Sequence, residues 1–304
     1  GGDGVQILQS TFNVVGTNVA GNVISANMGS GVSILDSPAC RENVVRGNRI
    51  GVDVTGSVRL GNAMNGVLIT ESPSNSIGGA LEGNVISGNG QAGIYIDGAG
   101  AEGNKVFDNK IGVDATTSVV LSNKTDGVAV MNAPRNTIGG TGLQGNNISG
   151  NGNFGVLLAG SQARGNRVLN NRLGISGAGA AMPNARCGVL CHNGASGTAI
   201  GGTNTSEANV IAYNNEHGVW VITSLATNNA ILGNSIFQHA GQGINLDMDS
   251  VTMNDSLDAD DGPNGLQNYP VIYSATTGSL HLGGNLFSKP STTYRVEFFL
   301  NTNE

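Results

Sequence analysis

Short runs of alternating apolar and polar residues recur along almost the whole chain. The most regular run is a glycine followed by an aliphatic residue, any residue and a second aliphatic residue. It occurs as GVQI at 4, GVSI at 31, GVLI at 66, GIYI at 93, GVAV at 127, GVLL at 155, GVLC at 188, GVWV at 218 and GINL at 243. A period of two is that of a half-buried β-strand, so each run predicts a short strand.

An asparagine followed two positions later by an aliphatic residue forms a second motif, which occurs twice between successive runs. The two copies are widely spaced in one set of intervals and five residues apart in the other. The first set is Asn13 and Asn22, Asn75 and Asn84, Asn136 and Asn146, Thr198 and Asn209; the second is Asn43 and Asn48, Asn104 and Asn109, Asn166 and Asn171, Asn229 and Asn234. Asn13, Asn75 and Asn136 follow one another after 62 and 61 residues, so the repeating unit spans two intervals.

Each interval thus contains three short strands bounded by glycine or asparagine, which tolerate left-handed backbone at corners. One unit cannot bury its apolar face, whereas units stacked about 4.8 Å apart share a continuous core. The pattern predicts an all-β fold, a parallel β-helix of about nine three-strand coils over residues 1–268. We expect Asn13, Asn75 and Asn136 to stack on one another or to cap backbone at a corner.

The pattern changes over residues 269–304, where YPVIYSA, SLHLGGNLF and TTYRVEFFLN predict three longer strands. These strands resemble the start of an immunoglobulin-like sandwich, so the segment is either a truncated module of that kind or a cap on the β-helix. A terminal coil exposes its sheet edges and core, which favours the cap. We expect the parent protein to continue beyond it.

The segments GNVISGN, NKVFDNKIGVDATT and NTIGG resemble the parallel β-helix repeats of the pectate-lyase-like superfamily. They are more closely similar to β-helix regions of large secreted or surface bacterial proteins, and the resemblance covers residues 1 to about 270. It implies a right-handed helix, as do parallel β crossovers in general, and an extracellular or cell-surface location. It implies no single activity, because the superfamily includes lyases, hydrolases, esterases, epimerases, tailspikes and inert stalks.

Composition and charge restrict the partners. Glycine accounts for 49 of the 304 residues, and only 12% are charged. Such a composition is typical of flexible linkers, but the regular aliphatic runs exclude one here. The net charge of −7 argues against nucleic acid and anionic membranes as partners. No apolar run is long enough to insert into a bilayer, and the N-terminal residues are already in the repeat register, so we read no signal peptide in this chain.

The middle residue of each Gly-aliphatic-x-aliphatic run is expected to face outward. In order, this row reads Gln6, Ser33, Leu68, Tyr95, Ala129, Leu157, Leu190, Trp220 and Asn245. Its apolar and aromatic members, Leu68, Tyr95, Leu157, Leu190 and Trp220, predict a polysaccharide-binding surface on which Tyr95 and Trp220 stack against sugars. Alternatively, loops such as 114–126 and 174–187, or a partner chain, cover the row.

A basic column lies on another face. Arg49, Lys110 and Arg172 occupy equivalent positions in alternate coils, with Lys105 and Arg167 beside the last two. Such a column fits an acidic polysaccharide such as pectate or alginate. The alternative is a charged surface that only keeps the protein soluble.

Six aspartates crowd into one stretch before the chain leaves the repeat: Asp247, Asp249, Asp255, Asp258, Asp260 and Asp261. Hard oxygen ligands at close spacing suit Ca²⁺, although the spacing is not that of an EF-hand. The stretch predicts a calcium site; the alternative is a solvated acidic loop.

Asp36, Glu71 and Asp97 follow three successive runs near one corner and are the best candidates for catalytic carboxylates. The catalytic motifs of pectate lyases and polygalacturonases are not found. Two hypotheses remain. The favoured one is a non-enzymatic extracellular scaffold or adhesin-like module that binds carbohydrate along an outer sheet face. The other is a lyase or glycoside hydrolase acting on an acidic polysaccharide.

Overall fold

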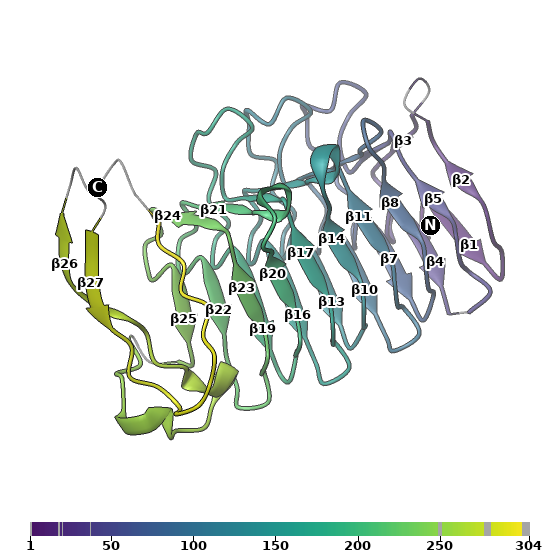
Figure 1. Cartoon of the computed structure of the whole chain (residues 1–304). Helices are drawn as coiled ribbons and strands as arrows, with labels where there is room; N and C mark the ends of the chain where they lie inside the picture. The colour runs from purple at the N-terminus through teal and green to yellow at the C-terminus, as the bar shows by residue number, and fades with distance from the viewer. Residues whose placement is uncertain are drawn as a thin grey trace.

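The computed structural model describes residues 2–17, 19, 21–36, 38–248, 251–276 and 281–299. Three parallel sheets run along the length of the molecule, and each turn of the chain contributes one strand to each sheet in succession (Figure 1). The chain is therefore a right-handed parallel β-helix, as the repeat predicts.

Sheet A is built from the nine glycine-led runs. Its strands, in order along the helix, are β1 (Val5–Leu8), β4 (Val32–Leu35), β7 (Val67–Thr70), β10 (Ile94–Asp97), β13 (Val128–Met131), β16 (Val156–Ala159), β19 (Val189–His192), β22 (Val219–Val221) and β25 (Ile244–Leu246).

Sheets B and C are built from the asparagine motifs and have eight strands each. Sheet B comprises β2 (Val14–Val15), β5 (Val44–Val45), β8 (Ser76–Gly78), β11 (Lys105–Phe107), β14 (Thr137–Gly139), β17 (Arg167–Leu169), β20 (Ala199–Gly201) and β23 (Ala230–Leu232). Sheet C comprises β3 (Val23–Ile24), β6 (Arg49–Ile50), β9 (Val85–Ile86), β12 (Lys110–Ile111), β15 (Asn147–Ile148), β18 (Arg172–Leu173), β21 (Val210–Ala212) and β24 (Ser235–Phe237).

Helical structure is limited to short 3-10 turns in the described residues. They are η1 (Gly142–Gln144), η2 (Thr205–Glu207), η3 (Ser256–Asp258) and η4 (Pro263–Leu266). None of the described helices has the length and apolarity needed to cross a bilayer.

The core is a set of aliphatic ladders that run through the coils. In sheet A, Val67, Ile94 and Val128 pair in register and are fully buried. Because each inward side chain lies on an equivalent one in the next coil, the apolar core is continuous along the rod.

All three corners of the coil carry an asparagine ladder. At most rungs, the side-chain oxygen accepts the backbone N–H of the equivalent asparagine in the preceding coil; Asn151 Oδ1 instead accepts the side-chain Nδ2 of Asn123, and the acceptor for Asn214 N–H is His239 Nδ1. The ladder before sheet B is Asn13, Asn43, Asn75, Asn104, Asn136 and Asn166, followed by Thr198, Asn229 and Asn264. The ladder before sheet C is Asn22, Asn48, Asn84, Asn109, Asn146, Asn171, Asn209 and Asn234. The ladder before sheet A is Asn27, Asn62, Asn89, Asn123, Asn151, Asn184 and Asn214, and it ends on His239.

These ladders confirm one of the two expectations for the repeated asparagines and exclude the other. Asn75 caps backbone at a corner, because its side-chain oxygen accepts the N–H of Asn43. Asn13 and Asn75 do not stack directly on each other, because Asn43 of the intervening coil lies between them. The two sequence sets interleave into two ladders, one before sheet B and one before sheet C, since the alternation in spacing lies in the loops and leaves the corners unchanged.

The C-terminal segment forms a two-stranded antiparallel hairpin, β26 (Val271–Thr276) and β27 (His281–Asn285), at one end of the helix (Figure 1). The third predicted strand, within TTYRVEFFLN, is not a strand in its described residues. The segment nevertheless contacts the last coils, because the Glu297 carboxylate accepts the backbone N–H of Gly233 at 2.7 Å. Just before the segment, Asn264 accepts the backbone N–H of Asn229.

We expect Asn109→Ala to destabilise the helix. The Asn109 side chain accepts the backbone N–H of Asn84 at 3.0 Å and donates to the carbonyl of Ile77 at 2.8 Å. Each buried group left without a partner costs about 1–3 kcal/mol. Chemical denaturation should show this loss, whereas Asn215→Ala, at an exposed position, should change the stability little. Equal stability of the two variants would contradict the role of the ladder.

Candidate functional site

The outer face of sheet C carries a row of residues in parallel register. The row reads Val23, Arg49, Val85, Lys110, Asn147, Arg172, Val210 and Ser235. Basic residues thus occupy every second coil from Arg49 to Arg172, and neutral residues lie between them. The structure confirms that the basic column predicted from the sequence forms a single row.

Loops that follow sheet C in alternate coils rise along one side of this row. These loops, residues 53–58, 114–119 and 176–180, are called the upper wall. They stack on one another, because Ala115 N donates to the carbonyl of Gly56 at 2.9 Å and Gly177 N donates to Thr117 Oγ1 at 3.2 Å. The wall is therefore a continuous surface along several coils.

Each upper-wall loop is closed by its first polar side chain. The Asp53 carboxylate accepts the backbone N–H of Val58 and of Ser57, both at 3.0 Å. These bonds, that of Val58 above all, lower the pKa of Asp53 to about 2. Asp114 closes the next loop through Ser118 and Val119, so the carboxylates of this wall serve as loop caps.

Loops between sheets B and C form the opposite side, here called the lower wall: residues 79–84, 140–146 and 202–209. Ion pairs hold two of them to sheet B or its corner, Glu82 to Arg46 and Glu207 to Arg167. Leu81 and Leu143, at equivalent positions in successive loops, are 73% and 62% exposed. The lower wall therefore presents an apolar residue at a two-coil interval.

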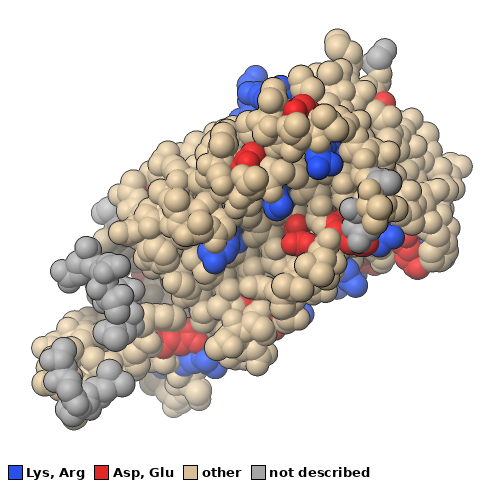
Figure 2. Space-filling view, turned by 90° about the horizontal axis from the view of Figure 1, so that it is seen from above, with Lys and Arg blue, Asp and Glu red and all other residues tan. Residues whose placement is uncertain are grey.

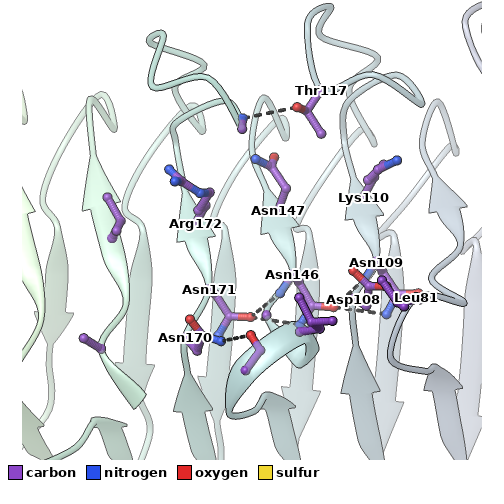
Figure 3. A pocket seen from close by; sticks show the side chains of 16 residues that line it. Leu81, Asp108, Asn109, Lys110, Thr117, Asn146, Asn147, Asn170, Asn171 and Arg172 are labelled. Atoms are coloured by element: carbon purple, nitrogen blue, oxygen red, sulfur yellow. Dashed lines mark hydrogen bonds between the residues drawn. The ribbon is translucent and has the colours of Figure 1, made fainter. Parts of the chain in front are cut away.

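A groove of about 360 Å³ lies between the two walls. Its floor includes Lys110, Asn147 and Arg172, with Thr117 on the upper-wall side and Leu81 on the lower-wall side (Figure 3). Seen from above, this face is hollowed, and Lys and Arg side chains lie along it together with Asp and Glu side chains (Figure 2).

The electrostatic character of the groove is basic. Lys110 Nζ donates to the carbonyl of Ala115 at 2.6 Å, and neither Lys110 nor Arg172 forms an ion pair with a described residue. Asp108 is the one carboxylate among the 16 residues that line the groove. Burial raises the pKa of Asp108, while Leu81 N–H and the Lys110 charge partly offset this effect.

The row on sheet A faces outward as expected but is partly covered. Leu68, Tyr95, Leu157 and Trp220 are half-buried, whereas Leu190 is only 4% exposed. Leu190 therefore offers little surface to a ligand, which corrects its assignment as a binding residue.

Residues that flank the strands cause this covering. Phe154, Cys187 and Leu190 form a small apolar cluster on the outside of sheet A, and Leu157 and Trp220 pack against it. The Arg186 guanidinium lies 4.8 Å from the Phe154 ring centroid and 5.7 Å from that of Trp220. Loop 174–187 thus covers part of the row, as the alternative interpretation expected.

The three candidate catalytic carboxylates lie at one end of the strands of sheet A, in successive coils. Asp36 Oδ1 accepts the Thr70 hydroxyl at 2.7 Å, and Glu71 Oε2 accepts the backbone N–H of Gly100 at 2.6 Å. Burial raises the pKa of Asp97, and the Glu71 carboxylate adds to the effect. The three are not among the described side chains whose ligand atoms converge within 4.8 Å, and their catalytic role stays a prediction.

The acidic stretch brings three of its six aspartates together. Ligand atoms of Asp255, Asp258 and Asp260 lie within 4.8 Å of one another, the one group of this kind in the described residues. Asp247 and Asp261 are not in the group, and Asp249 lies outside the described residues.

The chemistry of this group fits a hard cation. Asp258 is buried and accepts Asn268 N and Ser288 Oγ. One buried carboxylate oxygen each of Asp255 and Asp260 has no hydrogen-bond partner among the described residues. Burial, and then the charges of Asp255 and Asp258, raise the pKa of Asp260. A calcium ion would relieve this repulsion, and its presence stays a prediction.

The fold and the groove define a right-handed parallel β-helix with a basic channel on one outer face. No protein-family model and no curated protein matches the sequence. Among solved structures, the chain is similar to the periplasmic alginate epimerase AlgG, with 16% identity over 81% of this chain and 48% of that one and a TM-score of 0.42. A double mutant of AlgG has 16% identity over 81% of this chain and 47% of its own, with a TM-score of 0.40. The Dettilon tailspike protein has 16% identity over 81% of this chain and 54% of its own, with a TM-score of 0.42. The chain thus spans about half the length of these proteins.

Sequence reasoning found the basic column but missed the walls that turn it into a groove. The signal was present, because loops 79–84, 140–146 and 202–209 recur with the two-coil period and each places Glu82, Gln144 or Glu207 at an equivalent position. The sequence alone does not say on which side of a row such loops lie.

We expect calcium to raise the melting temperature of the chain by several degrees, and EDTA to reverse the effect, because an ion that binds only the folded state stabilises it. Differential scanning calorimetry with and without calcium measures the shift. Asp260→Asn should abolish it, whereas Asp261→Asn, outside the converging group, should retain it. A melting temperature that is independent of calcium would rule the site out.

Proposed function

We propose that the chain is a β-helical module of an extracellular or cell-surface protein and that it binds an acidic polysaccharide along the groove on sheet C. The observation that carries the proposal is the pair of cations in the groove floor. Lys110 and Arg172 face a groove open to solvent and form no ion pair with a described residue. A linear polyanion supplies carboxylates for both without a change in the fold.

Other cations of the chain support this interpretation by contrast. Arg46, Arg167 and Arg186 pair with Glu82, Glu207 and Glu216. Lys110 and Arg172 on the groove floor form no such pair with a described residue, although the charge of Lys110 acts on the nearby Asp108 carboxylate.

The shape of the groove also fits an extended chain. It runs across several coils between two walls. Exposed Leu81 and Leu143 on the lower wall match the apolar faces of pyranose rings.

The enzymatic alternative has less support in this groove. Glycoside hydrolysis generally uses two carboxylates, and the lining residues include one, Asp108. Ultraviolet detection of unsaturated products, and reducing-end assays, during the binding experiments below would identify a lyase or a hydrolase.

We expect Lys110→Gln and Arg172→Gln each to lower affinity for acidic polysaccharides by about threefold to tenfold and to reduce the salt slope of binding by about one. Isothermal titration calorimetry against polygalacturonate, alginate and hyaluronan at several salt concentrations measures both. Lys105→Gln is the matched control, since Lys105 lies on the outer face of sheet B and outside the groove. Equal losses in all three variants would place binding elsewhere or make it non-specific.

We expect Asp108→Asn to strengthen binding by about twofold to fivefold at neutral pH, because it removes a negative charge that opposes the ligand. The raised pKa of Asp108 gives the pH dependence its sign. As the pH falls through that pKa, the carboxyl becomes neutral, so wild-type affinity should approach that of the variant. The ratio of the two affinities removes the contribution of the ligand's own titration. A ratio independent of pH would contradict this role.

A further inference from the structure

The charge along the outer row of sheet C alternates with the coils. Arg49, Lys110 and Arg172 are separated by Val85 and Asn147 in the register of the sheet, and Lys110, Asn147 and Arg172 of this set form the floor of the groove. Successive coils lie about 4.8 Å apart, so successive cations are separated by about 9.6 Å. This spacing is fixed, because every coil is hydrogen-bonded to the next in three sheets.

Two coils span approximately the length of a disaccharide in an extended, equatorially linked polysaccharide. A polymer of uronic acids presents a carboxylate on every sugar and thus two in each such interval. A polymer in which uronic acid alternates with a neutral sugar presents one. The floor offers one cation per interval.

We propose that the groove selects polysaccharides with one anionic group per disaccharide over polymers with an anionic group on every sugar. The inference rests on the proposed function of the groove and adds the repeat pattern of its ligand. In this arrangement the anionic sugar lies over Lys110 or Arg172 and the neutral sugar lies over the coil between them.

The position between the two cations fits a neutral sugar. Asn147 is 8% exposed, and its Nδ2 donates to the carbonyl of Ile175 at 2.9 Å. The Asn147 side chain is neutral and its Oδ1 is buried, so this level of the floor adds no charge. A carboxylate here would lie over a neutral amide instead of a cation, and its desolvation would go uncompensated.

The lower wall repeats with the same interval. Leu81 and Leu143 are 62 residues apart at equivalent loop positions, and both line the groove. Each two-coil interval from Leu81 to Arg172 therefore contributes one apolar residue, one cation and one neutral floor position. That set matches the composition of an alternating disaccharide.

The test compares oligosaccharides of equal length: hyaluronan fragments, in which glucuronate alternates with N-acetylglucosamine, and oligogalacturonates, with a carboxylate on every sugar. Binding is measured by calorimetry over a range of salt concentrations. We expect hyaluronan fragments to bind more tightly than oligogalacturonates despite half the charge, with similar salt slopes, and equal affinities would contradict the selectivity. Affinity for hyaluronan should rise in steps of one disaccharide.

A variant with an added cation tests the same inference from the protein side. Val210 lies next to Arg172 in the following coil and lines the groove, so Val210→Lys places cations in two consecutive coils. It should raise affinity for oligogalacturonates about threefold more than affinity for hyaluronan fragments. Val44→Lys, on the outer row of sheet B, is the matched control, and circular dichroism confirms that both variants fold.

The outcomes separate the two levels of the proposal. Tighter binding of oligogalacturonates by wild type, with a steeper salt slope, would overturn the selectivity and leave the acidic-polysaccharide groove intact. An equal effect of Val210→Lys on both ligands would also overturn it. If wild type binds neither ligand nor any other acidic polysaccharide, the proposed function itself fails, and the selectivity fails with it.

Discussion

The rest of the structure depends on the asparagine ladders. A coil of three short strands must turn sharply three times, and each corner leaves backbone N–H groups that no strand satisfies. An asparagine at the corner accepts the N–H of the coil before it and donates to a carbonyl, as Asn109 does for Asn84 and Ile77. Because this bond forms only between adjacent coils in register, it fixes both the spacing of the coils and the angular position of each sheet.

That fixed geometry explains how the sequence can vary so much elsewhere. Insertions occur at the corners between ladder residues and leave the ladders intact. The spacing from Asn75 to Asn84 differs from that between Asn104 and Asn109, yet both pairs fill the same two corners. Loops inserted at one position in every second coil lie in a row, and two such rows form the walls of the groove. A surface feature with a two-coil period is thus a direct product of the two-interval repeat.

The fold was predictable because the sequence motifs that specify it repeat in every coil. The burial of outward-facing side chains was not predictable in the same way, because it depends on single residues that do not repeat. The Gly-aliphatic-x-aliphatic runs predicted the strands of sheet A and their inward faces, and the asparagine motifs predicted two of the three corners.

The third corner also has a recurring asparagine, since Asn62 and Asn89 lie four residues before Gly66 and Gly93. A motif that requires an aliphatic residue two positions after the asparagine does not detect it. Leu190 faces outward as predicted, but its burial was not predicted, because it is covered by Cys187 and Phe154, which lie outside its own Gly-aliphatic-x-aliphatic run. TTYRVEFFLN alternates like a strand but has no neighbour with which to pair among the described residues.

The net charge of −7 shapes what the groove can do. An acidic protein repels a polyanion at long range, and at physiological ionic strength this repulsion is screened beyond about 8 Å. Attraction is therefore confined to places where cations lie close to the ligand, and the groove floor provides Lys110 and Arg172 in such a place. Acidic groups elsewhere are occupied as loop caps or ion-pair partners, such as Asp53 and Glu207. Under the proposed function, a rigid rod with a basic channel among its described residues would thus restrict a long anionic chain to a single path, in a register determined by the coil spacing.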